Sequence, residues 1–276
     1  DVVCEAPVAQ ITLKGGRASG VVLADGTEFG ARRAVLGACD PRTTLERLLP
    51  AGTLDPDLER RVRAIPVANA NYGQMKVDVA LSGRLNLARH EKWRGDGLDL
   101  RLPSHMLGTE AGMERTYARA AAGLLPLPGE FSIWPVIPTA ADPSQAPDGQ
   151  DVLYLYSAVA PYQPEGGWDA VKAQAGQAIV DFASSYYGGL KDLEIGRQVL
   201  CNEDIGRDAH ATGGNIAHVD MTLGRTGPLR PARGLGGYRA PVAGLYLGGS
   251  GSHPGGGITG APGYLAAKEM LRNIRT

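Results

Sequence analysis

The stretch from Gly244 to Ala267 constrains the fold of this chain more than any other part of its sequence. Nine of the twenty residues from Gly244 to Gly263 are glycine, whereas glycine makes up roughly 7% of an average chain. Glycine lets the backbone adopt positive φ and lets another molecule come into contact with it. The run follows a short apolar strand at 245–247 and precedes apolar residues at helical spacing, so the sequence predicts a strand, a glycine loop and a helix.

The start of the predicted helix has the features of an anion-binding terminus. Thr259 is a suitable N-cap, and Pro262 falls in the first turn, where its missing N–H breaks no intrahelical bond. The free N–H groups and the positive end of the helix dipole favour an anion or an electron-rich carbonyl there. A cofactor-contacting loop is one interpretation. A tight turn that packs helix on strand without a ligand is the other.

Gly255, Gly257 and Gly260 match the dinucleotide-binding pattern G-x-G-x-x-G, but their context differs. That pattern belongs to a βαβ unit of about thirty residues with an acidic residue about twenty positions later. The sequence ends sixteen residues after Gly260. We therefore expect the loop to close a cofactor-binding domain and not to open one.

The sequence GLYLGGSGSHPGGGITGAPG at 244–263 resembles the carboxy-terminal flavin motif of the phytoene desaturase-like FAD-dependent oxidoreductases. It is most similar to the branch that includes pyridine nucleotide-disulphide oxidoreductase domain-containing protein 2. Further stretches agree with that branch in the same order, at 34–50, 137–153 and 211–224, the last followed by Arg230 and Pro231. The resemblance therefore runs through nearly the whole chain.

This resemblance implies a fold in two parts, α/β plus α+β. The remnant of an FAD-binding, glutathione reductase-like domain would carry an inserted mixed-sheet substrate domain. On this basis we place a partial FAD-binding domain at residues 1–55 and 235–276, and a substrate-binding domain at residues 56–234.

The resemblance also implies site residues. The backbone of Val8 would lie beside the adenine, although a buried strand valine is the commoner outcome at such a place. His253 is the ionisable side chain of the closing motif and could relay a proton beside the flavin. Hydride transfer from a hydrocarbon needs no side-chain base, so His253 could equally only order the loop. The remaining cofactor contacts are assigned to Gly248, Gly249, Ser250, Gly255, Gly256, Gly257, Ile258, Thr259 and Gly260.

The activity implied by the resemblance is FAD-dependent dehydrogenation, desaturation or isomerisation of a hydrophobic, isoprenoid-like or lipid-like substrate. Family members begin with a strand and a glycine loop that hold the FAD diphosphate, and no such motif precedes Asp1. We therefore expect this chain alone to bind FAD poorly and to be inactive without an N-terminal half or a partner subunit. Two alternatives stay open: a non-catalytic substrate-binding or protein-interaction module, and one subunit of a heterodimeric enzyme.

The composition is that of a globular protein, with 43% hydrophobic residues, 21% charged residues and a net charge of −1. This balance does not favour nucleic acid or an anionic membrane surface as a partner. No apolar run approaches the eighteen or so residues of a membrane span. Three cysteines without CxxC spacing indicate free thiols and no metal site. We expect a cytoplasmic protein and leave peripheral contact with a membrane open.

Apolar periodicity and turn signals predict alternating strands and helices. Strands are expected at 1–3, 8–13, 18–23, 29–36, 75–81, 131–137, 152–159 and 193–200, and helices at 43–49, 57–64, 115–125 and 168–187. The pair at 131–137 and 152–159 alternates bulky and small side chains. That pattern is typical either of the wall of a hydrophobic pocket or of a sheet packed on helices.

Residues 202–240 lack regular periodicity and are predicted to form a long functional or mobile loop. His210 and His218 have no third metal ligand in a suitable relation, so solvated or hydrogen-bonded histidines are expected. By the resemblance, the turn at 213–215 would approach the flavin. Two arginines are expected either to pair with a phosphate or carboxylate or to lie exposed: Arg230 and Arg233.

Overall fold

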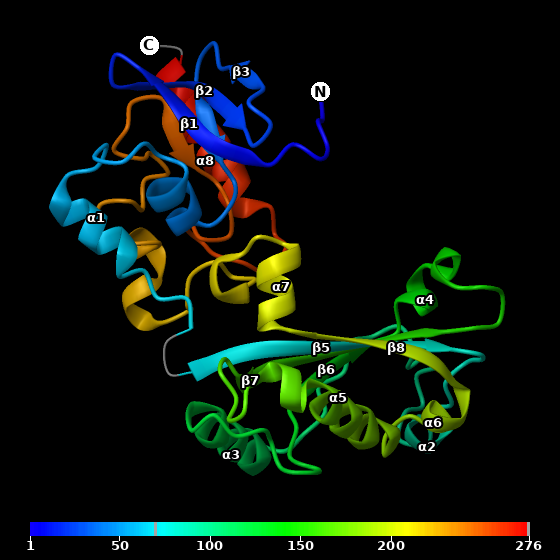
Figure 1. Ribbon diagram of the computed structural model, residues 1–276. Helices are drawn as coiled ribbons and strands as arrows, with labels where there is room; N and C mark the ends of the chain where they lie inside the picture. The colour runs from blue at the N-terminus through cyan, green and yellow to red at the C-terminus, as the bar shows by residue number, and fades with distance from the viewer. Residues whose placement is uncertain (69–70, 275–276) are drawn as a thin grey trace. The chain divides into compact units, whose positions relative to one another are not determined.

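The computed structural model describes residues 1–68 and 71–274. The chain divides into two units, which Figure 1 shows as ribbons. Unit 1 combines the segments Asp1–Val67 and Ala209–Thr276, and unit 2 is the continuous segment Ala68–Asp208. Each unit has its own hydrophobic core, and the two cores share no residue.

Unit 1 begins with an antiparallel meander. The strand β1 (Val8–Lys14) pairs with β2 (Arg17–Leu23), and β2 pairs with β3 (Glu28–Gly30). Gly15 and Gly16 turn the chain between β1 and β2 with φ of 58° and 75°, which side chains rarely allow. The strands predicted at 8–13 and 18–23 are confirmed.

A second, parallel sheet joins two distant parts of unit 1. The strand β4 (Val35–Gly37) pairs with β9 (Leu245–Leu247). The prediction of a single strand at 29–36 is therefore wrong, because its first residues pair with β2 and its last with β9, and residues 31–34 carry the chain between the two sheets. The strand predicted at 1–3 is also wrong, since these residues are exposed and irregular.

Short helices complete the core of unit 1. A π-helical turn, η1 (Thr43–Arg47), precedes α1 (Pro56–Arg63), which Asp55 caps by accepting the N–H of Leu58 at 2.9 Å. The helix α8 (Ala261–Ile274) follows the glycine-rich loop. The core combines both segments of the unit and includes Ile11, Leu45, Leu58, Val62, Ile65, Val219, Leu235, Leu245 and Leu247.

The units divide at residues 67 and 209, whereas the sequence placed the domain boundaries at 55 and 235. The difference has a physical cause, because Leu58 and Val62 of α1 and Val219 of the later segment are buried in the core of unit 1. Residues 69–70 of the predicted substrate domain and 275–276 of the predicted FAD-binding domain lie outside the described residues.

Unit 2 is built on a four-stranded sheet in the order β6 (Ile133–Val136), β7 (Val152–Pro161), β5 (Tyr72–Leu81) and β8 (Glu194–Cys201). All three pairings are antiparallel. The expected mixed sheet is thus antiparallel within unit 2, and the parallel pairing occurs in unit 1 between β4 and β9. The chain as a whole combines helices with both kinds of pairing.

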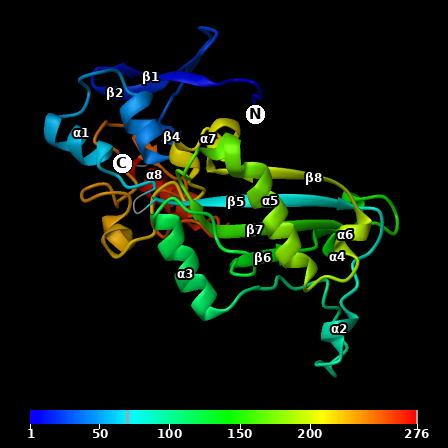
Figure 2. The ribbon, with the colours of Figure 1, turned by 60° about the horizontal axis from the view of Figure 1, so that its bottom comes forward.

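The longest helix of unit 2 covers one face of this sheet. Figures 1 and 2 show α5 (Trp168–Ser184) lying across it, with α3 (Glu110–Ala121) at one end. Shorter helices are α2 (Ala88–Glu91), α4 (Pro138–Ala141) and α6 (Leu190–Leu193). Alternate strand residues pack against α5 in a core that contains Met75, Val77, Val79, Leu153, Leu155, Ile179 and Val180.

The segment 202–240 is more regular than its sequence indicates. The helix α7 (Asn202–Asp208) begins it. Asp204 accepts the N–H of Cys201 at 2.9 Å and lies 2.5 Å from the Lys172 ammonium of α5, so contacts distant in sequence stabilise this helix. The rest contains three-residue 3₁₀ turns at Thr212–Gly214, Leu223–Arg225 and Gly227–Leu229. Within residues 1–68 and 71–274, no helix has the length and apolar character needed to cross a bilayer.

Candidate functional site

The first half of the glycine-rich loop, residues 248–251, packs tightly against the chain that follows β4. A Cβ on Gly249 would lie 2.1 Å from the carbonyl oxygen of Ala38, and a Cβ on Gly251 would lie 2.4 Å from Cδ of Pro41. Protein interiors cannot absorb such overlaps without moving the backbone. These glycines are therefore required for packing, with or without a ligand.

The second half of the loop, residues 256–260, leaves its backbone open. A Cβ on Gly260 would meet nothing within 4 Å, and on Gly256 or Gly257 it would meet nothing closer than 3.8 Å. Ile258 is fully exposed and has a φ of 56°, which is a genuine outlier for a β-branched residue. Backbone strain of this kind clusters at ligand-binding sites. A ligand can approach the main chain closely here.

The helix after the loop starts one residue later than a Thr259 cap requires. Gly260, with a φ of 68°, directly precedes α8, which begins at Ala261. The hydroxyl of Thr259 nevertheless accepts the N–H of Ala261 at 3.2 Å. Pro262 lies in the first turn, as predicted.

Three buried polar atoms beside the loop have no hydrogen-bond partner among the described residues: Ser252 Oγ, His253 Nδ1 and His218 Nδ1. The side chain of His218 reaches the loop, since its Cβ lies 3.3 Å from the place of a Cβ on Gly251. Burial lowers the pKa of His218, with Asp40 opposing this shift. Buried polar atoms are nearly always hydrogen-bonded, so these three fit the polar groups of a bound cofactor.

Arg230 is completely buried and holds this loop in place. Its Nη2 donates to the carbonyls of Ala217 at 2.6 Å and Ser250 at 2.9 Å, and Nη1 and Nε also donate to carbonyls. Burial lowers the pKa of Arg230, and the negative charge of Asp220 partly offsets the shift. Neither interpretation from the sequence describes Arg230, because it is not exposed and its nitrogens bind the main chain and not an anion. Arg233 is exposed.

The sequence did not single out Asp40, although it is 1% exposed and central to this region. Its carboxylate accepts the N–H of Thr43 at 2.9 Å, the hydroxyl of Thr43 at 2.6 Å and the N–H of Thr212 at 3.4 Å. It thereby links the end of β4 to the turn at 212–214. An aspartate directly before a proline is a helix-start signal, with Asp as N-cap and Pro at the first helical position, and could have identified it.

The other predicted residues are placed as follows. Val8 is the first residue of β1 and is 38% exposed, so it is not a buried strand valine. Its role beside an adenine stays a prediction. His210 is exposed, and no group of three or more metal-binding side chains occurs in the part of the chain that the structure describes. Of the loop residues, Gly248 and Gly255 are buried, Gly249, Ser250, His253 and Gly256 are half-buried, and Gly257, Ile258, Thr259 and Gly260 are exposed.

Unit 2 carries a second candidate surface, on the face of the sheet opposite its core. Trp134 stacks on Tyr156 with ring centroids 5.8 Å apart, and Tyr156 stacks on Tyr154 at 6.3 Å. The Lys76 ammonium lies 4.8 Å from the Tyr154 ring, and the Tyr156 hydroxyl donates to Gln74 at 2.7 Å. Burial raises the pKa of Tyr156 to about 12, which keeps the phenol neutral. This aromatic row offers a flat surface to an apolar molecule.

Alternation along β6 and β7 separates the two interpretations of this strand pair. Ile133, Leu153 and Leu155 are buried in the core against the helices, so the sheet packed on helices is confirmed. The intervening residues Trp134 and Tyr156 form the aromatic row on the other face. Their use as the wall of a substrate pocket stays a prediction.

Comparison with known proteins gives relatives but no matching family model. An alignment of 280 positions covers 98% of this chain and 47% of pyridine nucleotide-disulfide oxidoreductase domain-containing protein 2 of Rattus norvegicus, at 32% identity. It is 28% identical over 153 residues to the lycopene-forming phytoene desaturase of Pseudescherichia vulneris, a match that covers 54% of this chain and 29% of that protein.

Among solved structures, cyclohexylamine oxidase from Brevibacterium oxydans IH-35A has a similar fold. Its TM-score is 0.54 at 15% identity, over 98% of this chain and 49% of that one. The chain spans about half the length of the curated relatives that it matches along nearly its whole sequence. It is a homologue of pyridine nucleotide-disulfide oxidoreductase domain-containing protein 2 and of the phytoene desaturases, which confirms the resemblance to the phytoene desaturase-like FAD-dependent oxidoreductases.

Proposed function

We propose that this chain is the carboxy-terminal part of an FAD-dependent oxidoreductase that dehydrogenates, desaturates or isomerises a hydrophobic substrate of isoprenoid or lipid-like character. One observation carries the proposal: the open backbone at 256–260 lies in the same loop as two buried polar atoms, on Ser252 and His253, that have no hydrogen-bond partner among the described residues. The homology to desaturases supports the reaction class.

In this proposal unit 1 is the partial FAD-binding domain. FAD would supply the acceptor for a hydride from the substrate. The main chain at Gly256, Gly257 and Gly260 leaves room for it, and the Ser252 hydroxyl and His253 Nδ1 would bind its polar groups. His253 would orient the loop or hold a proton at Nδ1. Arg230 would act indirectly, by fixing Ser250 and the loop around it.

Unit 2 would be the inserted substrate-binding domain. The aromatic row of Trp134, Tyr154 and Tyr156 would bind the apolar part of the substrate, since stacked half-buried rings exclude water without needing polar partners. No carboxylate lies in the row itself, although Asp78 is opposite Tyr154 in the strand register and pairs with Lys76 at 2.9 Å. The surface is therefore close to neutral, as a hydrocarbon requires.

The test is a titration of the full chain with FAD, followed by quenching of FAD fluorescence. We expect saturable but weak binding, and we expect Gly256→Leu to weaken it at least tenfold. A Cβ on Gly256 would have no neighbour closer than 3.8 Å, so we expect the variant to fold, while the rest of the leucine side chain would occupy the space beside the open backbone. The matched control is Gly196→Leu in β8, where a Cβ also meets nothing within 4 Å.

Equal affinity in wild type and Gly256→Leu would place FAD elsewhere on the chain. Loss of binding in both leucine variants would indicate a general effect on folding, which thermal unfolding of the variants would reveal. Absence of saturable quenching up to about 1 mM, a binding free energy of roughly −4 kcal/mol, would contradict the idea that these residues bind FAD by themselves.

A second candidate function has one observation in its favour. β9 is bordered on its far side by Arg239, which bridges to Tyr246, whereas β4 has no further partner strand among the described residues. Leu36 of β4 is 40% exposed, and a parallel pair of short strands is normally part of a larger covered sheet. Unit 1 would then be an interaction module that accepts a strand from another segment or subunit along β4. Absence of FAD binding by the chain alone would favour this candidate.

A further inference from the structure

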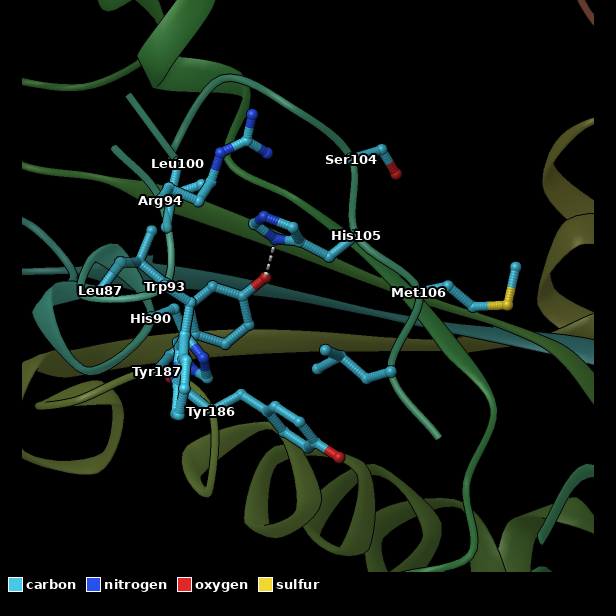
Figure 3. A pocket seen from close by; sticks show the side chains of 11 residues that line it. Leu87, His90, Trp93, Arg94, Leu100, Ser104, His105, Met106, Tyr186 and Tyr187 are labelled. Atoms are coloured by element: carbon cyan, nitrogen blue, oxygen red, sulfur yellow. Dashed lines mark hydrogen bonds between the residues drawn. The ribbon is translucent and has the colours of Figure 1, made fainter. Parts of the chain in front are cut away.

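A cavity of about 530 Å³ lies within unit 2, and Figure 3 shows the side chains that line it. Its walls include Leu87, Leu100, Leu107 and Tyr187, which are buried members of the same core that packs against α5. The volume falls in the range of small-molecule sites, about 300–1,000 Å³. Nothing in the proposed flavin or substrate chemistry uses this cavity.

Flat rings form much of the lining. His90 stacks on Tyr186 at an angle of 17° between the rings, and its Nε2 lies 3.0 Å from the Tyr186 carbonyl oxygen. Trp93 also lines the cavity and is 78% exposed, which is unusual for tryptophan. A planar apolar ligand would cover its ring and stack within this wall.

His105 supplies a hydrogen-bond donor to the cavity. Its Nδ1 lies 3.0 Å from the hydroxyl of Tyr187, as the dashed line in Figure 3 marks. Tyr187 is 1% exposed and burial raises the pKa of its phenol, so the hydroxyl keeps its proton and donates a hydrogen bond to a partner. We therefore assign Nδ1 as the acceptor of this hydrogen bond, which places the imidazole hydrogen on Nε2. The structure gives Nε2 no partner among the described residues.

The charge of the lining favours an anion. Arg94 lines the cavity, and none of the described lining residues is a carboxylate. Arg94 pairs with Asp96 through Nε at 3.1 Å and also through Nη2, and both side chains are exposed. Exposed ion pairs contribute little, so a carboxylate on a ligand can compete with Asp96 for the guanidinium.

We propose that this cavity binds a small aromatic carboxylate, whose ring lies among Trp93, His90 and Tyr186 and whose carboxylate accepts from His105 Nε2 and Arg94. The occupant is thus a planar apolar anion, and its binding does not depend on FAD. The site is separate from the aromatic row, because the two lie on opposite faces of one sheet.

Isothermal titration calorimetry of the full chain with 2-naphthoate tests the proposal, with 2-naphthylmethylamine as the cationic counterpart. We expect one saturable site for naphthoate and at least tenfold weaker binding of the amine. His105→Phe keeps a ring of similar size but removes the donor, and Arg94→Gln removes the charge. Each variant is expected to weaken naphthoate binding at least fivefold. The control is Arg84→Gln, which changes an exposed arginine outside the lining and should leave naphthoate binding unchanged.

A blocking variant tests the location. Ser104 lines the cavity and is exposed, so Ser104→Trp should fill the space without disturbing the core and abolish naphthoate binding. The control Ser144→Trp changes an exposed serine in a different turn and should leave binding intact. The proposal is overturned if naphthoate shows no saturable binding, if Ser104→Trp binds it normally, or if the amine binds as tightly as the carboxylate.

Discussion

Single glycines between β9 and α8 serve two needs that look identical in sequence. Gly249 and Gly251 are glycine because Ala38 and Pro41 leave no room for a Cβ. Gly260 has open space around it and instead adopts a φ of 68°. The density of glycine predicted the loop correctly. It could not assign each glycine to packing or to an open backbone, since the contacts that decide this come from the chain after β4.

Arg230 shows a different limit of residue-scale prediction. An arginine in a polar, irregular segment is usually exposed, and nothing in its neighbours indicates burial. Its burial depends on carbonyls of Ala217, Val219 and Ser250, which face it only after the loop has formed. The residues next to Arg230 in the sequence, a proline and nearby glycines, give no indication that these carbonyls will surround its side chain.

We expect Arg230→Met to lower the free energy of unfolding by about 3 kcal/mol, because buried carbonyls lose a charged donor that no neighbour replaces. Lysine should not rescue the fold, since it lacks the planar set of donors. Urea unfolding of the variants measures the effect. The control is Arg233→Met, an exposed neighbour expected to stay within about 0.5 kcal/mol of wild type. A similar small change for both variants would contradict the structural role of Arg230.

Elements with strong periodicity were predicted well, and elements stabilised by distant contacts were not. The helix expected at 168–187 is α5, and the strands expected at 75–81, 152–159 and 193–200 are β5, β7 and β8. The prediction of one strand at 29–36 was wrong because the two ends of this segment pair in different sheets. The helix α7 was missed because its first turn depends on an ion pair between Asp204 and Lys172.

A substitution at Gly176 tests whether side-chain packing or helix propensity determines the contribution of this position to the stability of α5. It lies inside α5, where alanine would be favoured by about 1 kcal/mol from propensity alone. A Cβ there would lie 2.5 Å from Cγ2 of Val199 in β8. We expect Gly176→Ala to lower the free energy of unfolding by about 1–2 kcal/mol, as overpacking does, and Val199→Ala to restore part of the loss in the double variant.

Gly263 of α8 is the matched control for this prediction. A Cβ there would find its nearest neighbour at 3.9 Å, which is ordinary contact. Gly263→Ala should therefore raise the free energy of unfolding by up to about 1 kcal/mol. If Gly176→Ala stabilised the protein as much as Gly263→Ala, the close contact between α5 and β8 would not constrain the helix.

At the scale of the whole molecule, the sequence indicated two parts but not where they divide. The pattern of strands and helices contains no signal that α1 belongs with residues more than 150 positions later, yet Val62 and Val219 share one core. The parallel pairing of β4 with β9 is equally remote in sequence. The resemblance to known proteins predicts a unit formed by the first and last segments of the chain, whereas local periodicity does not predict it.

The two separate cores lead to a prediction about independent folding. Residues 68–208 form a continuous unit whose core lies within the segment, so this piece expressed alone should unfold cooperatively in urea, as small domains do. Residues 1–67 alone should lack a cooperative transition, because their core needs Val219, Leu245 and Leu247. Circular dichroism against urea concentration distinguishes the outcomes. A non-cooperative 68–208 piece would contradict the independence of unit 2.

The discontinuity of unit 1 has a consequence for how the chain is made. On a ribosome, residues 1–67 emerge before residues 68–208, whose addition takes on the order of 10 s at roughly 5–20 residues per second. Throughout that interval Ile11, Leu45 and Val62 lack the later residues that bury them. Unit 2 can fold during synthesis, but the core of unit 1 cannot be completed until residues 209–276 are made. The apolar side chains of residues 1–67 are therefore accessible to other chains for as long as residues 68–208 are being made.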